Sequence, residues 1–296
     1  MHRIGSDFMR WNDFDVEKIG ETFYVVRQAK GCNIGVCVKD NSALIVDAGY
    51  LPKKSAVLKK ILEKNLDCRI ELLFNTHYHS DHTFGNQSFE CLILSSEECR
   101  YIMQANLSTY WTPEEIAQAK EEDPELAGDW KNLQITFPTI TFKDQLCYDF
   151  KGIKIIFQKL GGHSKDSSIA LFPDYKLLFS GDIVFGESYP TLLPHDGSPF
   201  ELVEALQKIT DMDVEIIIPG HGATCDKGMA KRLIEYWECL TSECRKLIGS
   251  GLNDEKIQEI LSDRCHLQMV PINERKHKRN VDSVLKFIRE HLEMFP

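Results

Sequence analysis

The chain has 296 residues, of which 43% are hydrophobic and 27% charged, and its formal net charge is −10. This length suits one large α/β unit with an appendage, and the composition is that of an ordinary globular protein. The negative charge argues against nucleic-acid binding and against docking on an anionic membrane surface, because both need a basic face.

The N-terminal segment MHRIGSDFMRWNDFD lacks the apolar stretch of a secretory signal. No other stretch approaches the roughly 18 apolar residues of a membrane span. The ten cysteines include no C-x-x-C pair, so neither a zinc knuckle nor a thioredoxin-type redox site is indicated. Ten thiols without a signal fit a reducing compartment, and we expect a cytoplasmic protein.

The first 95 residues predict strands and one helix. Apolar, β-branched runs bounded by turn residues indicate the strands. A basic amphipathic helix begins at Pro52 and runs to about residue 64. The predicted strands cover 22–28, 33–39, 42–49, 70–76 and 91–95.

Residues 96–134 change character and predict a helical insertion that contains the acidic run EEDPE at 121–125. The insertion is either a lid or pocket wall, or a solvated excursion. Tyr110 and Trp111 suit an apolar lid and suit plain helix packing equally well.

The second half predicts more strands and then a helical tail. The basic run RKHKR at 275–279 is typical of a solvated helix start. We therefore expect an α/β fold with two sheets, comprising a catalytic domain at 1–229 and a C-terminal helical region at 230–296. The predicted strands cover 139–150, 153–158, 168–172, 176–180 and 214–219, and the helices 199–209, 226–249, 254–262 and 280–294.

The segment HYHSDH at 77–82 has the spacing of a metal-binding loop. Alternation along the end of a strand sends His77 and His79 to the same side. Ser80-Asp81 is good turn chemistry and can bring Asp81 and His82 round to a second position beside the first. Three imidazoles and a carboxylate within six residues is a demanding arrangement for a solvated loop.

Three more candidate ligands, His163, Asp182 and His221, follow or end apolar strands, and a glycine directly precedes each of these residues. Sites in open α/β folds gather at strand ends. Singly, a histidine there is more often structural, and Gly-Asp is more often a turn.

Taken together, the candidate ligands make two sets that could hold two metal ions and leave positions open for water. The first set is His77, His79 and His163, the second is Asp81, His82 and His221, and Asp182 can bridge the two.

These residues resemble the metallo-β-lactamase superfamily. NTHYHSDHTFGN at 75–86 looks like its signature loop, and LGGHSKDS, SGDIVF and IIPGHG look like its later motifs in family order. IVDAG at 45–49 resembles the opening motif, in which Asp47 would support the ligands. The resemblance covers roughly 20–225 and implies a four-layer αβ/βα sandwich with the metals at one edge between two sheets.

Details within the superfamily narrow the activity. His79 stands where the oxygen-reducing diiron flavoproteins typically carry an acidic residue, and Asp182 resembles the glyoxalase II, lactonase and phosphodiesterase branches. The glutathione signature of glyoxalase II is missing from DIVFGESYPTLLPHDG, which puts a glutathione thioester in doubt. In this loop Tyr189 and His195 are candidate substrate contacts, although a solvated loop histidine is the commoner case.

We therefore predict a binuclear metal-dependent hydrolase in which a metal-bridging hydroxide cleaves a small ester, thioester or lactone. Asp81 would be the catalytic residue that orients the nucleophile. Five imidazoles suit Zn²⁺, with Fe or Mn as alternatives.

Other readings stay open: a phosphodiesterase or ribonuclease of the same fold, a mononuclear iron sulfur dioxygenase, and a non-catalytic metal-binding scaffold. We expect a small-molecule substrate, neither nucleic acid nor membrane as partner, and a homodimer as one option.

Overall fold

We describe the protein from a computed structural model that covers residues 6–28 and 30–291. The chain folds into two compact units. The first consists of Met1–Lys159 with Ser168–Asp174, and the second of Leu160–Ser167 with Tyr175–Pro296. Within the described ranges, no helix combines the length and apolar character that crossing a bilayer requires.

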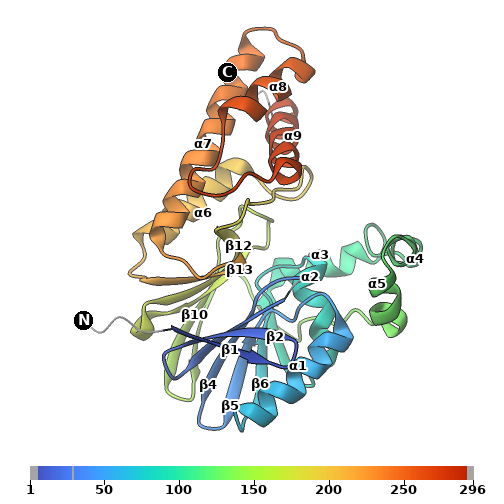
Figure 1. Ribbon diagram of the computed structural model, residues 1–296, viewed down its shortest axis with the longest axis vertical. Helices are drawn as coiled ribbons and strands as arrows, with labels where there is room; N and C mark the ends of the chain where they lie inside the picture. Colours follow the sequence, from blue (N-terminus) through green and yellow to red (C-terminus); the bar gives the residue numbers. More distant parts are fainter. Residues whose placement is uncertain (1–5, 29, 292–296) are drawn as a thin grey trace. The chain divides into compact units, whose positions relative to one another are not determined.

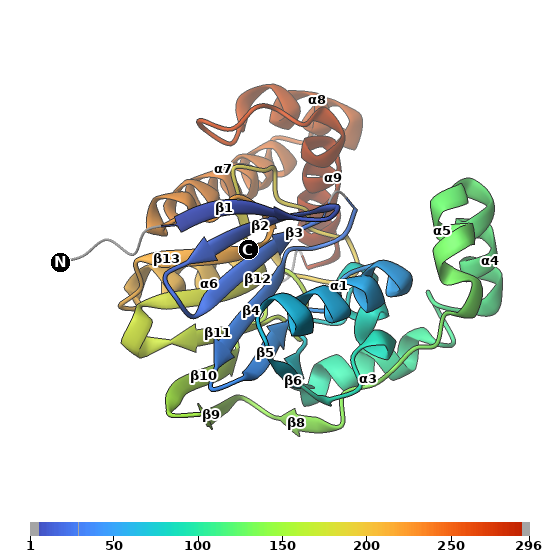
Figure 2. The same ribbon diagram turned by 60° about the horizontal axis from the view of Figure 1, so that its bottom comes forward.

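An eight-stranded sheet forms most of the first unit (Figures 1 and 2). Its order follows the chain: β1 (Ser6–Trp11), β2 (Phe14–Ile19), β3 (Phe23–Arg27), β4 (Ile34–Lys39), β5 (Ser42–Val46), β6 (Arg69–Phe74), β7 (Leu92–Ser96) and β8 (Ile140–Phe142). Strands β1 to β5 pair antiparallel, and β5 to β8 pair parallel. The strands predicted between residues 22 and 95 are confirmed, with ends that shift by a few residues.

Helix α1 (Pro52–Asn65) connects β5 to β6, because parallel neighbours need a crossover. Figure 2 shows it lying along these strands. Its buried residues Leu58 and Leu62 are one turn apart and belong to the same hydrophobic cluster as Ile45 and Leu73. The predicted amphipathic helix is thereby confirmed.

The insertion between β7 and β8 is helical, as predicted. Its helices are α3 (Glu97–Asn106), α4 (Pro113–Glu122), α5 (Pro124–Asp129) and the 3₁₀ turn η2 (Trp130–Asn132). Trp111 and Trp130 are buried in a cluster with Tyr78 and Phe84, which belong to the segment after β6. The ring centroid of Phe84 lies 5.1 Å from that of each tryptophan. The insertion is therefore packed against the HYHSDH loop.

The remaining strands form one further set in each unit. In the first unit, β10 (Ile153–Lys159) pairs antiparallel with β9 (Gln145–Phe150) and with β11 (Ser168–Phe172). In the second unit, β12 (Leu177–Gly186) pairs parallel with β13 (Ile216–Gly222). The prediction of a single strand at 139–150 is wrong. These residues form two strands in different sheets: β8 ends at Phe142, and β9 begins at Gln145.

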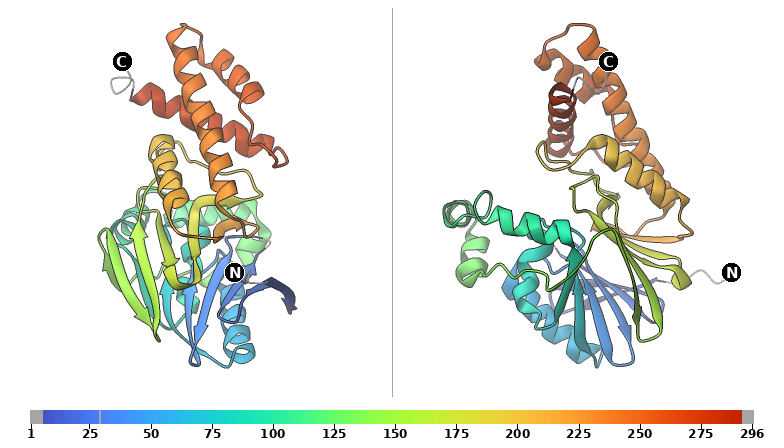
Figure 3. Two further views of the ribbon diagram at one scale, coloured as in Figure 1. Left: turned by 90° about the vertical axis from the view of Figure 1, so that its left-hand side faces the viewer. Right: turned by 180° about the vertical axis from the view of Figure 1, so that it is seen from behind.

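The second unit continues with α6 (Pro199–Asp211), which connects β12 to β13, and with α7 (Lys227–Gly249), α8 (Asp254–Arg264) and α9 (Glu274–Glu290). Figures 1 and 3 show α8 and α9 lying against α7. The helical C-terminal region is confirmed. Helix α7 runs through residue 229, and the predicted domain boundary there stays a prediction.

Two features of these helices differ from the prediction. Helix α9 begins at Glu274 rather than at 280, because the side chain of Asn273 caps it by accepting from the Lys276 N–H. The expectation of ten free thiols is wrong for Cys239 and Cys265, which form a disulfide between α7 and the end of α8.

Candidate metal centre

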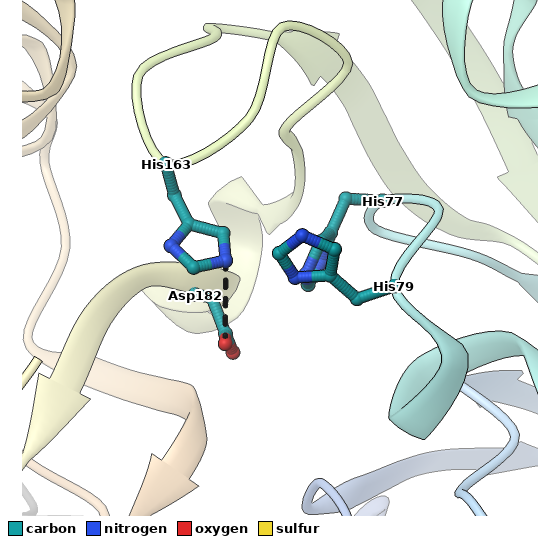
Figure 4. A group of neighbouring side chains, drawn as sticks. All are labelled: His77, His79, His163 and Asp182. Carbon is teal, nitrogen blue, oxygen red and sulfur yellow. Dashed lines mark hydrogen bonds and ion pairs between the residues drawn. The ribbon is translucent and has the colours of Figure 1, made fainter. Parts of the chain in front are cut away.

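The HYHSDH segment leaves β6 and turns at once into the short helix α2 (Ser80–Thr83). Nε2 of the buried His77 lies 2.9 Å from Nδ1 of His79, and Figure 4 shows both rings at the end of this loop. The turn of α2 places the His82 ring 4.1 Å from that of His77. One strand end and one helical turn thus bring three imidazoles together in the first unit.

A hydrogen-bonded chain fixes the orientation of two of these rings. Asp47 follows β5 in a left-handed conformation, with φ of 63°. Its Oδ1 accepts from the Thr76 N–H at 2.8 Å, and its Oδ2 accepts from the Thr76 hydroxyl at 2.9 Å and lies 2.8 Å from Nδ1 of His82. The Thr76 Oγ1 in turn lies 3.0 Å from Nδ1 of His77.

These contacts determine which ring nitrogen carries the proton. A carboxylate accepts only, so Nδ1 of His82 donates to Asp47. The Thr76 hydroxyl already donates its hydrogen bond to Asp47, so its oxygen accepts from Nδ1 of His77. In its neutral form each ring then presents the lone pair of Nε2, which is the form that binds a metal ion. The donor set of the first unit therefore fits a cation.

Two further side chains border these rings. Asp81 lies in the first turn of α2 with its side chain 30% exposed, and its Oδ2 is 3.8 Å from Nε2 of His82. Cys32 is fully buried and offers a sulfur within 4.8 Å of ligand atoms of Asp47 and His82. Burial raises the pKa of its thiol to about 12. The sequence pattern did not single out Cys32, because only folding brings the start of β4 to the end of β5.

The other three candidate ligands come together in the second unit. Oδ2 of Asp182, in β12, lies 3.6 Å from Nε2 of His163 and 3.4 Å from Nε2 of His221. Figure 4 marks the first of these contacts with a dashed line. The His221 ring also stacks on Phe185, with centroids 5.6 Å apart and planes inclined by 9°. One carboxylate oxygen thus faces two imidazoles, as expected of an oxygen that shares metal ions with them.

Glycines allow β12 and β13 to approach closely enough for this arrangement. A Cβ on Gly222 would lie 1.7 Å from the carbonyl oxygen of Gly186, and Gly222 has φ of 86°. The pairing of the two strands also shifts register between Phe179 and Phe185. This irregularity surrounds Asp182, which lies within β12 rather than after it.

Tyr189 and His195, the two residues predicted to contact substrate, differ in their exposure to solvent. Tyr189 is buried, its hydroxyl accepts from the Leu267 N–H at 3.0 Å, and burial raises its pKa. His195 is exposed. The Tyr189 hydroxyl is therefore used within the second unit, and substrate contact by either residue stays a prediction. For Trp111 the packing role holds, since it is buried beside Tyr78.

Comparison with known proteins places the chain in a family. Residues 27–221, which include every candidate ligand, match the model of the Metallo-beta-lactamase superfamily. The chain belongs to this superfamily. The recognition from sequence and the α/β fold class are confirmed, and the protein is a metallo-β-lactamase superfamily hydrolase. Members of the superfamily usually bind metal ions, which agrees with the presence of histidine and aspartate groups that could hold a metal ion.

Several curated and solved superfamily proteins are similar over much of the chain. An acyl-coenzyme A thioesterase, MBLAC2 from Bos taurus, is 24% identical and aligns over 77% of this chain and 86% of its own length. A hydroxyacylglutathione hydrolase from Brucella anthropi is 22% identical over 64% of this chain and 59% of its own. The structure of the sec-alkylsulfatase Pisa1 from Pseudomonas sp. aligns with a TM-score of 0.70 at 13% identity, over 95% of this chain and 52% of the sulfatase. This chain thus spans about half of the sulfatase, whose likeness shows the fold.

Proposed function

We propose that this superfamily hydrolase holds two divalent metal ions and cleaves a thioester to a carboxylic acid and a thiol. The observation that carries the proposal is the chain of hydrogen bonds from Asp47 through Thr76, which presents the Nε2 lone pairs of His77 and His82. A thioester is favoured over an oxygen ester or lactone because two of the relatives are named for thioester hydrolysis.

The proposed ligands are those predicted from the sequence. His77, His79 and His163 would hold one ion, Asp81, His82 and His221 the other, and Asp182 would be shared. Imidazole-rich sets suit Zn²⁺, and Fe or Mn are alternatives. When bound, such ions lower the pKa of a water molecule and polarise a carbonyl oxygen.

The side chains of this protein would contribute orientation and charge. Asp47 holds His82 in the tautomer that binds metal. Asp81, whose side chain is partly exposed, would orient the attacking water through a carboxylate oxygen. The Asp182 carboxylate would fix His163 and His221 and offset part of the positive charge. A small-molecule substrate, a cytoplasmic location and a homodimer stay predictions.

The test compares metal content and hydrolysis in purified protein. His79→Ala and Asp182→Ala should each lose bound metal and the hydrolysis of hexanoyl-coenzyme A, followed by release of the thiol. His291→Ala and Asp211→Ala, which remove the same residue types outside the ligand sets, should keep both. Unchanged metal content and hydrolysis in both ligand variants would sink the proposal, and cleavage of bis-p-nitrophenyl phosphate in place of the thioester would favour a phosphodiesterase.

A further inference from the structure

The first unit has a pocket of ≈ 230 Å³ that no candidate metal ligand lines. It lies between the start of α1, the end of β3 and the β1–β2 turn. Four of its lining side chains are cationic and only one is acidic, Asp13. The cations are Arg27, Lys30, Lys53 and Lys54.

The start of α1 favours an anion in this pocket. The first turn contains no acidic residue, and the N-cap residue Leu51 makes no side-chain cap. The first turn instead contains Lys53 and Lys54. Cations at a helix N-terminus are unfavourable, because they add to the positive end of the helix dipole. An anion is the group that would stabilise such a helix start.

Acidic side chains of the insertion already meet these cations. Lys30 pairs with Asp123, and Lys54 pairs with Glu125 at 2.5 Å. The Lys53 ammonium donates to the carbonyl oxygen of Gly128 at 2.5 Å, and its backbone N–H donates to a carboxylate oxygen of Asp129 at 3.0 Å. The side chains of Lys54 and Glu125 are 48% and 44% exposed. Exposed pairs of this kind contribute about 0–1 kcal/mol, so a multiply charged ligand can displace them.

Gln28 supplies a second, independent observation. It lines the same pocket, and both atoms of its side-chain amide are buried without a hydrogen-bond partner among the described residues. A buried polar group left in this state costs about 1–3 kcal/mol. In the described conformation this amide lies against Gly49, and a rotation of the side chain would let its Nε2 donate to a phosphate oxygen in the pocket.

The pocket also adjoins the metal-binding loop. Gly31 follows Lys30, and a Cβ on Gly31 would lie 3.1 Å from the Cβ of Tyr50 and 3.7 Å from the carbonyl oxygen of Asp81. The turn that holds Lys30 therefore lies against the backbone of the HYHSDH segment. A ligand held by Lys30 would be a neighbour of this half of the candidate metal centre.

We propose that this pocket binds the phosphate groups of a phosphorylated thiol carrier, the leaving half of the thioester substrate, in competition with Asp123 and Glu125. The inference rests on the proposed thioester hydrolysis and adds the substrate class. The similar protein named an acyl-coenzyme A thioesterase makes coenzyme A the first carrier to test.

The main experiment distinguishes recognition of the carrier from cleavage of the thioester bond. Kinetics are measured with hexanoyl-coenzyme A and with the hexanoyl thioester of N-acetylcysteamine, which has no phosphate. In the variant Lys53→Ala/Lys54→Ala, KM for the coenzyme A ester should rise about tenfold, which corresponds to roughly 1.4 kcal/mol. KM for the phosphate-free ester and kcat for both should stay unchanged. The control Lys60→Ala/Lys64→Ala removes the same charge from α1 outside the pocket and should behave as the unaltered protein.

A rise in KM for both esters, or for neither, would overturn the inference. Calorimetric titration with adenosine 3′,5′-bisphosphate tests the pocket without catalysis, and binding should be lost in Lys53→Ala/Lys54→Ala. If the bisphosphate does not bind the unaltered protein, or if inorganic phosphate binds equally well, the proposal that the pocket recognises the thiol carrier is overturned. The proposed thioester hydrolysis would still stand. Bisphosphate binding without cleavage of either thioester would instead overturn the proposed function and the leaving-group role together.

Because the acidic side chains are proposed to compete with the ligand, removing one of their charges should increase the affinity for the coenzyme A ester. Glu125→Gln releases Lys54 for the ligand while Lys30 keeps its pair with Asp123, so KM for hexanoyl-coenzyme A should fall about two- to fivefold, within the energy of one exposed ion pair. Glu121→Gln, an acid of α4 outside these pairs, is the matched control and should leave KM unchanged. An unchanged or higher KM in Glu125→Gln would overturn the competition.

Discussion

Replacing Asp47 by Asn tests the hydrogen-bonded chain that orients the candidate ligands. Asn tolerates the left-handed φ of 63° at this position, so the backbone should keep its path. An amide has one acceptor oxygen where the carboxylate has two. Its NH₂ group cannot accept, so one side of the carboxylate loses its hydrogen bonds: either the Thr76 N–H at Oδ1, or both the Thr76 hydroxyl and Nδ1 of His82, which lie 2.9 Å and 2.8 Å from Oδ2.

The expected loss follows from this geometry. A hydrogen bond to a charged group contributes about 1.5–3 kcal/mol. Removing the carboxylate that orients a metal-binding histidine typically weakens metal binding about 10–100-fold, which is the same range of energy. We therefore expect the Asn variant to bind Zn²⁺ about 10–100-fold more weakly, and excess metal to restore part of its hydrolytic rate.

The assay is competition for Zn²⁺ between the metal-free protein and a chromophoric chelator. Asp40→Asn is the matched control, because Asp40 also has positive φ, of 48°, but lies in the turn between β4 and β5. If Asp47→Asn binds Zn²⁺ within twofold of the unaltered protein, the assignment of the histidine tautomers is refuted.

Three further predictions concern stability. Gly85→Ala places a Cβ 1.9 Å from the carbonyl oxygen of Ala48 and should lower the free energy of unfolding by about 3 kcal/mol in urea titration; a loss under 1 kcal/mol would contradict the close approach. The disulfide joins Cys239 and Cys265 across a sequence separation of 26, so reduction should destabilise the protein by about 3.5 kcal/mol and leave the Cys239→Ser variant unaffected. Burial lowers the pKa of His277 below its ordinary 6.5, so the unfolded chain binds a proton first and stability should fall as pH drops from about 7 toward 5. In His277→Gln, melting temperature should depend less on pH over this interval, and an identical pH profile would exclude His277 as the cause.

Much of the fold and the identity of the candidate ligands can be predicted from local patterns. Apolar runs between turn residues predicted β3 to β7, and HYHSDH predicted the metal-binding loop after β6. The patterns were insufficient where pairing with distant strands determines where a strand begins and ends. Residues 139–150 look like one strand, but a turn at Lys143-Asp144 sends its two halves to different sheets. The β1–β2 hairpin mixes charged with apolar side chains, and its pairing with β3 makes it part of the sheet.

Long-range contacts account for the rest. Asp47 and Thr76 are far apart in sequence, and their hydrogen bonds depend on the parallel pairing of β5 with β6. The Cys239–Cys265 bond depends on how α8 packs on α7. The spacing of residues along the chain carries no information on either contact.

The aromatic cluster between the insertion and the HYHSDH loop gives this protein an optical signal of its own. Two of its four tryptophans, Trp111 and Trp130, are buried beside Tyr78 and Phe84, within the segment that carries the candidate ligands. Indole emission is sensitive to the polarity and motion of its surroundings. A change in the packing around this loop can therefore be followed by intrinsic fluorescence, without attaching a dye.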